Sequence, residues 1–192
     1  MGSKSIIIML GHLYRSIGMI KLIILDVDGV MTNGRKFYDK DGNIICKEFC
    51  DKDWTAIKRF KALGIPVVFL SGDSFNRKIA EGRNIPFFHN IGPKEQYLHR
   101  ICNTFNVFPK ECVYVGDDLF DVTIAKLVGY TFCPADAIEE MKNISVTLGT
   151  NGGNNVIMYL YNHFVDMQYI PEYTPDQMKN IYDLDSKEIK HV

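Results

Sequence analysis

The stretch that decides the fold is Ile20-Lys21-Leu22-Ile23-Ile24-Leu25-Asp26-Val27-Asp28-Gly29. It is a nearly unbroken apolar run that stops abruptly at two acids and a glycine. Such runs are typical of strands buried on both faces of a parallel sheet, whereas half-exposed strands alternate apolar and polar residues. We therefore expect a buried strand over residues 20–25, with Asp26 and Asp28 at its carboxyl end.

Two further apolar runs end in the same way. Residues 65–70 precede Ser71-Gly72, and residues 112–115 precede Gly116-Asp117-Asp118. Helical periodicity and shorter apolar runs fill the intervals, and predict helices over residues 53–63, 94–105, 119–127 and 154–165, another helix after residue 73, and strands at 86–88 and 129–132. This alternation predicts an α/β fold, a three-layer Rossmann-like arrangement around a central, mainly parallel sheet.

A small β-hairpin flap is expected between the first strand and the first long helix, because Asp41-Gly42 forms a turn signal between two short apolar runs. The hairpin and helix fill the interval from Asp28 to Ser71, and a helix and strand fill that from Ser71 to Lys94. Neither interval has room for a cap domain of about 50 residues. We expect an N-terminal extension (1–18), one catalytic domain without a cap (19–166), and a C-terminal tail (167–192) with a short helix near 175–183.

The composition excludes several classes of protein. Among 192 residues, 22 Lys and Arg stand against 23 Asp and Glu, which is not the basic balance of a nucleic-acid binder. No apolar run approaches the roughly 20 residues that cross a membrane. The five cysteines are scattered and odd in number, which argues against a disulfide framework or a zinc site. We expect a cytoplasmic protein with reduced thiols that binds neither nucleic acid nor membrane.

The polar residues that follow the three strands predict a shared site. The carboxyl ends of parallel strands meet at one edge of the sheet, so the side chains there should converge. They include four carboxylates, those of Asp26, Asp28, Asp117 and Asp118. A divalent cation relieves their repulsion, and oxygen ligands favour Mg²⁺. Lys94, at a predicted helix start, adds a positive charge suited to phosphoryl oxygens. Each motif alone has an ordinary explanation as a turn, cap or surface lysine, but their conjunction does not.

The chain resembles the haloacid dehalogenase superfamily over residues 20–165. Within it, the resemblance is to the small cap-less branch that contains 3-deoxy-manno-octulosonate 8-phosphate phosphatase, nonulosonate 9-phosphate phosphatases and the C-terminal domain of some acylneuraminate cytidylyltransferases. The motifs that carry it are Asp26–Gly34 (DVDGVMTNG), Asp41-Gly42, Leu70–Gly72 (LSG), Lys94, Gly116–Asp121 (GDDLFD) and Thr150–Gly153 (TNGG).

This resemblance implies a Mg²⁺-dependent phosphatase that acts on a small sugar phosphate, with 2-keto-3-deoxy sugar acid phosphates as the candidate class. Asp26 would attack phosphorus and form an aspartyl-phosphate. Asp28 would protonate the leaving oxygen and then activate the hydrolytic water. Ser71 and Lys94 would hold phosphoryl oxygens, so the implied catalytic set is Asp26, Asp28, Ser71 and Lys94. A phosphomutase remains an alternative activity.

The resemblance also implies a metal site formed by Asp26, Asp117 and the backbone carbonyl of Asp28. Asp118 and Asp121 would orient metal-bound waters or Lys94. The candidate substrate contacts are Thr32, Gly72 and Arg77. Asp73 stands where the branch usually has arginine, so recognition of a substrate carboxylate would pass to other cations; the candidates are Arg77, Lys78 and Arg83.

In this branch, homotetramers cover the open crevice with a neighbour's hairpin and tail. Phe37, Tyr38, Ile44 and Ile45 are the candidate interface, with packing of the hairpin on its own domain as the alternative.

Two other hypotheses compete with the phosphatase. One is a non-catalytic oligomerisation or regulatory domain of this fold, associated with sugar-acid metabolism of the CMP-sialic acid type. The intact Asp26, Asp28, Lys94 and Asp117 argue against it. The other is a phospho-accepting receiver domain, but in a receiver the phosphorylated aspartate follows the third strand and the lysine follows the fifth.

Overall fold

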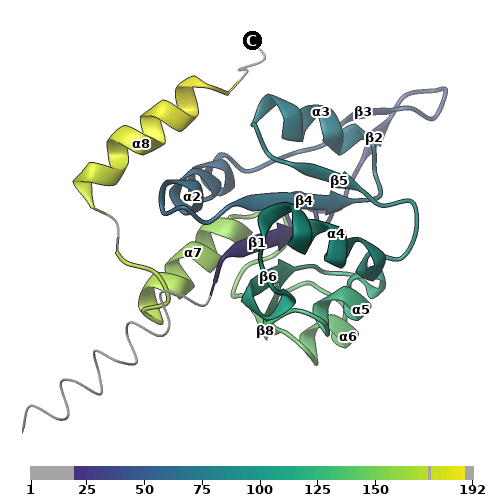
Figure 1. Ribbon diagram of the computed structural model, residues 1–192. Helices are drawn as coiled ribbons and strands as arrows, with labels where there is room; N and C mark the ends of the chain where they lie inside the picture. The colour runs from purple at the N-terminus through teal and green to yellow at the C-terminus, as the bar shows by residue number, and fades with distance from the viewer. Residues whose placement is uncertain (1–19, 173, 189–192) are drawn as a thin grey trace, which may run out of the picture.

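Six parallel strands form the centre of the molecule in this computed structural model, which describes residues 20–172 and 174–188 (Figure 1). The strands are β1 (Leu22–Leu25), β4 (Val67–Ser71), β5 (Phe87–His89), β6 (Cys112–Val115), β7 (Tyr130–Cys133) and β8 (Val146–Thr147). Their order is β5-β4-β1-β6-β7-β8, so the chain winds outward from β1 to β5 and then returns to the other side of β1. The strand order therefore reverses between β1 and β6, which is where ligands bind in sheets of this type.

Helices cover both faces of the sheet, which explains the unbroken apolar run of β1. Ile23 and Leu25 face one core, which also contains residues of α2 (Asp51–Ala62), α3 (Phe75–Gly82) and α7 (Val156–Asp166). Leu22 and Ile24 face the other core, which contains residues of α4 (Glu95–Phe105), α5 (Val122–Ala125) and α6 (Glu139–Lys142). Because successive side chains of a strand point to opposite faces, each of these four residues is fully buried. The predicted three-layer fold is confirmed.

The hairpin of β2 (Phe37–Tyr38) and β3 (Ile44–Cys46) projects from the body of the molecule (Figure 1). The carboxylate of Asp39 accepts hydrogen bonds from the backbone N–H groups of Asp41 and Asn43, which closes the predicted turn. Phe37 and Ile45 are 60% and 61% exposed, and Tyr38 is exposed as well, whereas Ile44 is half-buried. Three of the four candidate interface residues are therefore left open to solvent, and Ile44 packs on its own domain.

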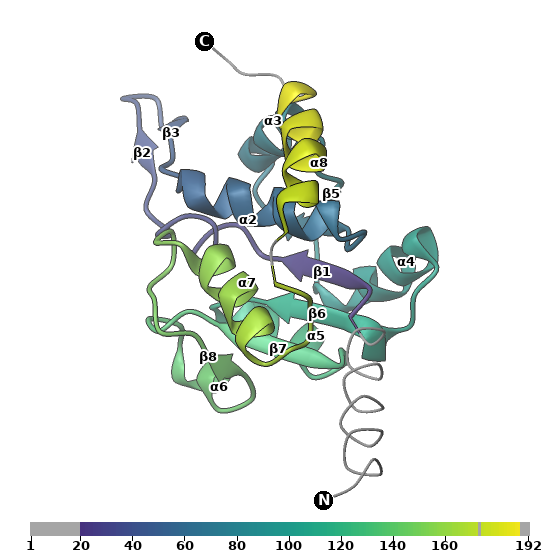
Figure 2. The same ribbon diagram turned by 90° about the vertical axis from the view of Figure 1, so that its left-hand side faces the viewer.

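The segment after α7 returns to the body of the molecule. Ile170 lies in the core, and α8 (Pro175–Ser186) runs alongside α2 (Figures 1 and 2). The Nζ of Lys58 on α2 lies 2.5 Å from Asp185 and 3.2 Å from Glu188, and Arg83 lies 2.8 Å from Glu188. The expected short helix is thus a helix of 12 residues held to α2 by ion pairs.

Some local predictions were wrong or missing. The single helix expected over 119–127 is instead a 3-10 turn, η2 (Leu119–Asp121), followed by the four-residue α5. The Asp121 carboxylate folds back onto the backbone of Asp117 and Asp118, and the chain winds tightly there. The short elements β8, α6 and the 3-10 turn η1 (Pro109–Glu111) were not predicted. The N-terminal extension lies outside the described residues, among which no helix combines the length and apolar character needed to cross a membrane.

Candidate active site

The first acidic loop leaves the sheet at the end of β1. The backbone N–H of Asp26 still pairs with the carbonyl of Val115, at 2.9 Å, and the carbonyl of Val27 then accepts from the N–H groups of Met31 and Thr32. Gly29 closes this turn with φ of +88°, and a Cβ there would lie 1.9 Å from the Oδ2 of Asp117. Only glycine therefore lets the loop after β1 approach the loop after β6.

A buried acid organises the second loop. The Oδ2 of Asp121 accepts from the backbone N–H groups of Asp117 and Asp118, at 2.9 and 3.1 Å. Its Oδ1 accepts from the Tyr114 hydroxyl at 2.6 Å and from Lys94 at 2.5 Å. Both oxygens of Asp121 are thus occupied by protein donors, so this residue supports the loop and the lysine.

Lys94 connects the two loops at the start of α4. Its Nζ lies 2.9 Å from the Oδ1 of Asp26 and 2.5 Å from the Oδ1 of Asp121, and its side chain is only 6% exposed. Burial disfavours the ammonium, but the charges of Asp26 and Asp121 outweigh burial and hold the pKa of Lys94 above its ordinary value. Lys94 is therefore a fixed cation beside Asp26.

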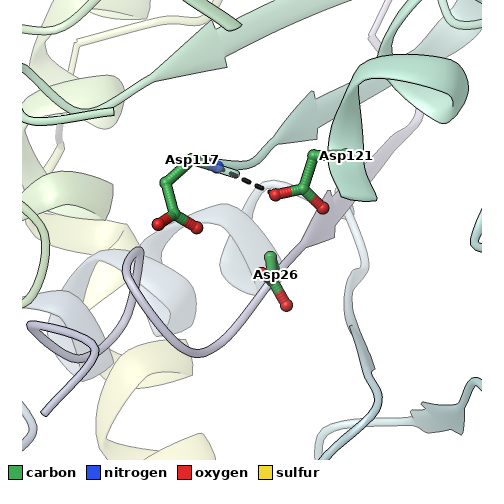
Figure 3. Close-up of side chains that lie close together, drawn as sticks. All are labelled: Asp26, Asp117 and Asp121. Atoms are coloured by element: carbon green, nitrogen blue, oxygen red, sulfur yellow. Dashed lines mark hydrogen bonds between the residues drawn. The ribbon is translucent and has the colours of Figure 1, made fainter. Parts of the chain in front are cut away.

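Oxygens of Asp26, Asp117 and Asp121 all lie within 4.8 Å of one another (Figure 3). Burial raises the pKa of Asp26 to about 7, although Lys94 acts in the opposite direction. Burial, followed by the charges of Asp26 and Asp121, raises the pKa of Asp117 to about 8. The Oδ1 of Asp117 is buried and has no hydrogen-bond partner. Crowded carboxylates with an unpaired buried oxygen fit a divalent cation, for which Asp26 and Asp117 offer the available ligands.

Asp28 lies apart from this cluster. Its two carboxylate oxygens lie 2.7 and 2.9 Å from the Nζ of Lys47, which follows the hairpin, and the amide nitrogen of Asn76 donates to Oδ2 at 3.1 Å. The Lys47 side chain is fully buried. Neither Lys47 nor Asn76 could be identified from the sequence, because one lysine near a hairpin and one asparagine in a helix carry no distinctive pattern.

Asp73, the departure noted from the sequence, joins the same network. Its Oδ2 accepts from Lys47 at 2.7 Å and from Lys36 at 2.8 Å, and its Oδ1 accepts from the backbone N–H of Phe75. Burial opposes the charged form, but these hydrogen bonds outweigh it and hold the pKa of Asp73 well below its usual range. Asp73 is thus a carboxylate that binds two lysines.

Ser71, the last residue of β4, faces the same crevice. Its Oγ accepts from the backbone N–H of Asp73 and from the amide nitrogen of Asn76, at 3.2 and 3.0 Å. A cavity of about 560 Å³ gathers these groups; its lining includes Asp26, Asp28, Lys36, Ser71, Gly72, Asp73, Lys94, Asp118 and Asp121. The structure therefore places all four predicted catalytic residues around one cavity.

Two predicted substrate contacts do not line this cavity. Thr32 is fully buried, and its hydroxyl lies 3.5 Å from the Oδ1 of Asp28. The guanidinium of Arg77 lies over the ring of Phe87, 5.1 Å from its centroid. Gly72 does line the cavity. Thr32 is therefore a buried neighbour of Asp28, and Arg77 packs on Phe87 of β5.

The last motif, Thr150–Gly153, packs against the first loop. A Cβ on Gly152 would lie 2.1 Å from the carbonyl oxygen of Gly29, and the N–H of Gly153 donates to the carbonyl of Val30 at 2.9 Å. The motif's glycines thus fix the position of the Asp26 loop.

A Rossmann-like sheet whose first strand ends in Asp-x-Asp, with serine, lysine and a second acid pair around the same crevice, defines a phosphatase of the haloacid dehalogenase type. Residues 40–129 match the family of haloacid dehalogenase-like hydrolases. The 3-deoxy-D-manno-octulosonate 8-phosphate phosphatase of Haemophilus influenzae is 36% identical over 138 residues, which are 70% of this chain and 76% of that enzyme. The chain belongs to the haloacid dehalogenase-like hydrolases, in the branch of these phosphatases.

Further comparisons agree. The phosphatase of the same name from Salmonella typhi is 28% identical over 66% of this chain and 68% of its own length. The cobalt-bound structure of the deoxy-D-mannose-octulosonate 8-phosphate phosphatase from Haemophilus influenzae superposes with a TM-score of 0.74 at 30% identity, covering 80% of this chain and 91% of that one. The protein is thus an enzyme, a phosphatase, and its cluster of Asp26, Asp117 and Asp121 could hold a metal ion.

Proposed function

We propose that this enzyme is a Mg²⁺-dependent phosphatase for a sugar acid phosphate of the 3-deoxy-D-manno-octulosonate 8-phosphate type. The observation that carries the proposal is the convergence of Asp26, Asp28, Ser71 and Lys94 on one cavity, in a chain 36% identical to an enzyme named for that substrate.

The proposed reaction starts at Asp26. Its carboxylate attacks phosphorus, the bond to the sugar oxygen breaks, and an aspartyl-phosphate forms. Lys94 holds Asp26 in position and neutralises phosphoryl oxygens, and the Ser71 hydroxyl donates to another of them. Both groups are nearly fully buried, so their charge and dipole act with little screening by water.

Asp28 handles the protons in this proposal. It gives a proton to the departing sugar oxygen, and then takes one from the water that attacks the aspartyl-phosphate. The Lys47 and Asn76 contacts fix the orientation of its carboxylate between these two steps. Release of inorganic phosphate restores Asp26.

The residues proposed to hold Mg²⁺ are Asp26, Asp117 and the backbone carbonyl of Asp28. When bound, the ion supplies positive charge to the phosphoryl oxygens. Asp118 lines the cavity and is proposed to orient water on the ion, while Asp121 positions Lys94 through their 2.5 Å contact.

The proposal also includes association of copies and a cytoplasmic location. The exposed Phe37, Tyr38 and Ile45 on the projecting hairpin support a homotetramer in which hairpins cover neighbouring sites. The five unpaired cysteines support a reducing compartment. Light scattering of the purified protein tests the tetramer.

The test of function is release of inorganic phosphate from a panel of hexose, 2-keto-octonate and nonulosonate phosphates, with Mg²⁺ and with chelator. We expect release that requires Mg²⁺ and is fastest on a sugar acid phosphate. Asp26→Asn should lower turnover by at least about 1,000-fold. Asp166→Asn, which changes an exposed acid at the end of α7 outside the cavity, is the matched control and should leave turnover unchanged. Release by Asp26→Asn at the wild-type rate would refute the mechanism.

A further inference from the structure

The cavity contains more anionic than cationic side chains, which raises the question of how it would accept an acidic sugar. Among the described residues, its lining carboxylates are Asp26, Asp28, Asp73, Asp118 and Asp121, while its lining cations are Lys36 and Lys94. Lys94 belongs to the phosphate end, because it contacts Asp26. Any second anion of the substrate therefore meets Lys36.

Lys36 stands where it can act on the sugar. It precedes β2, and its Nζ lies 2.8 Å from the Oδ2 of Asp73 and 3.8 Å from the Oδ2 of Asp28. Asp28 is the proposed proton donor to the leaving sugar oxygen, so the Lys36 ammonium lies on the sugar side of the scissile bond. Its side chain is 25% exposed, unlike the enclosed Lys47 and Lys94.

The Lys36 ammonium can donate further hydrogen bonds. An ammonium has three N–H groups, and within the described residues Asp73 is its one hydrogen-bond acceptor. Burial disfavours the charge, but the bond to Asp73 and the attraction of Asp28 and Asp73 outweigh burial, so the pKa of Lys36 lies above its ordinary value. Lys36 is therefore a cation held in place by Asp73 with room for a second acceptor.

The other candidate cations are engaged elsewhere. Lys47 already contacts Asp28, Asp73 and Asn76 and is fully buried. Arg77 stacks on Phe87, and Arg83 stacks on Trp54 and pairs with Glu188. Neither these arginines nor Lys78 lines the cavity.

Building on the proposed function, we propose that Lys36 is the residue that recognises the carboxylate of the sugar, and that Asp73 holds it in position. Asp73 stands where the resembled branch usually has arginine. In this chain, the cation comes from the hairpin instead, and the acid after Ser71-Gly72 anchors it. The enzyme then selects acidic over neutral sugar phosphates through a single lysine.

The experiment compares two substrates that differ only in charge: 3-deoxy-D-manno-octulosonate 8-phosphate and the analogue in which an amide replaces its carboxylate. The wild-type enzyme should favour the acid in kcat/KM by about 10- to 100-fold, the range of one charge-assisted hydrogen bond. Lys36→Met should reduce this ratio to within a few-fold of one, mainly through a higher KM for the acid. Lys36→Arg should retain most of the preference, because it keeps the charge.

The matched control is Lys126→Met, which removes an exposed lysine at the end of α5, outside both the cavity and the hairpin. It should leave both kcat/KM values unchanged. A wild-type enzyme that does not favour the acid would overturn the inference, as would a Lys36→Met variant that loses activity equally on both substrates. Hydrolysis of neither substrate by the wild-type enzyme would instead refute the proposed function, and this inference with it.

Discussion

Gly29 and Asp117 approach so closely that a single methyl group cannot fit between them: a Cβ on Gly29 would lie 1.9 Å from the Oδ2 of Asp117. The two residues belong to loops that follow β1 and β6, the strands between which the strand order reverses. Their contact fixes the spacing between the proposed nucleophile loop and a proposed metal ligand.

Gly29→Ala should therefore damage the site more than the fold. We expect at least a 100-fold loss of phosphatase activity, because the added methyl group displaces Asp117. Holding an alanine at this positive φ by itself costs about 1–2 kcal/mol of folding stability. Gly64→Ala is the matched control, since Gly64 has φ of +76° and nothing within 4 Å of its Cβ position. Both variants should melt at similar temperatures, with only Gly64→Ala fully active; equal activity of the two would contradict this reading.

Protons should compete with the metal. Because burial raises the pKa of Asp26 to about 7 and that of Asp117 to about 8, both must lose protons before a cation binds. Below pH 7 the apparent affinity for Mg²⁺ should fall by about tenfold per pH unit for each of these carboxylates. Isothermal titration between pH 6 and pH 9 measures this. An affinity that does not change with pH would contradict it.

The same pKa values predict how stability changes with pH. A carboxyl whose pKa is raised by folding stabilises the native state at low pH, and that contribution is lost as pH rises through the folded-state pKa. The chelated protein should therefore lose stability as pH rises from about 4, near the ordinary carboxyl pKa, to about 8, the higher of the folded-state pKa values of Asp26 and Asp117. Added Mg²⁺ should raise the melting temperature more at pH 8.5 than at pH 6. Calorimetry with and without chelator measures these melting temperatures. A larger Mg²⁺-induced rise at pH 6 than at pH 8.5 would contradict the prediction.

The Tyr114 hydroxyl should stabilise the fold through Asp121, the residue that also contacts Lys94. Its hydroxyl donates to the same Asp121 oxygen that contacts Lys94, in a fully buried position. Tyr114→Phe removes a hydrogen bond to a charged group, which is worth about 1.5–3 kcal/mol. A domain of this size should then melt about 3–12 °C lower. Tyr182→Phe, at an exposed position of α8, should have no effect. Equal melting temperatures of the two variants would refute the role of Tyr114.

The ion pairs of Glu188, just after α8, should stabilise the fold more than an exposed surface ion pair does. Glu188 is nearly buried and contacts both Lys58 and Arg83. Glu188→Gln should cost about 1–3 kcal/mol, because Lys58 is left with less compensation in a buried position. Glu139→Gln, which breaks the exposed pair with Lys142, should cost at most about 0.5 kcal/mol. Urea denaturation measures both. A larger loss of stability in Glu139→Gln than in Glu188→Gln would contradict the stabilising role of Glu188.

Much of the fold and the core of the site could be predicted from the sequence, because they depend on strong local patterns. Leu22–Leu25 and Cys112–Val115 are continuous apolar runs that end in acids, so both the strands and the convergence of Asp26 with Asp117 follow from them. The short, exposed strand Val146–Thr147 has no such pattern, since parallel pairing with β7 alone defines it.

The support around the site could not be predicted. Lys47 and Asn76 reach Asp28 across 19 and 48 residues of sequence, and Tyr114 reads as one more apolar residue of its strand. Their roles depend on tertiary packing, which periodicity does not reveal. In the sequence, Asp73 indicated only that the arginine usual in the branch is absent. In the structure, its carboxylate accepts hydrogen bonds from Lys36 and Lys47, which flank the hairpin.

Lys47 connects the hairpin to the proposed proton donor, Asp28. The end of the hairpin is attached to Asp28 through the fully buried ammonium of Lys47, while its strands present the exposed residues Phe37, Tyr38 and Ile45. Ordering of these strands by a neighbouring copy would therefore also restrict the carboxylate that moves protons. Under the proposed assembly, dilution would lower the turnover of each remaining site as well as the number of assemblies, so specific activity would depend on protein concentration.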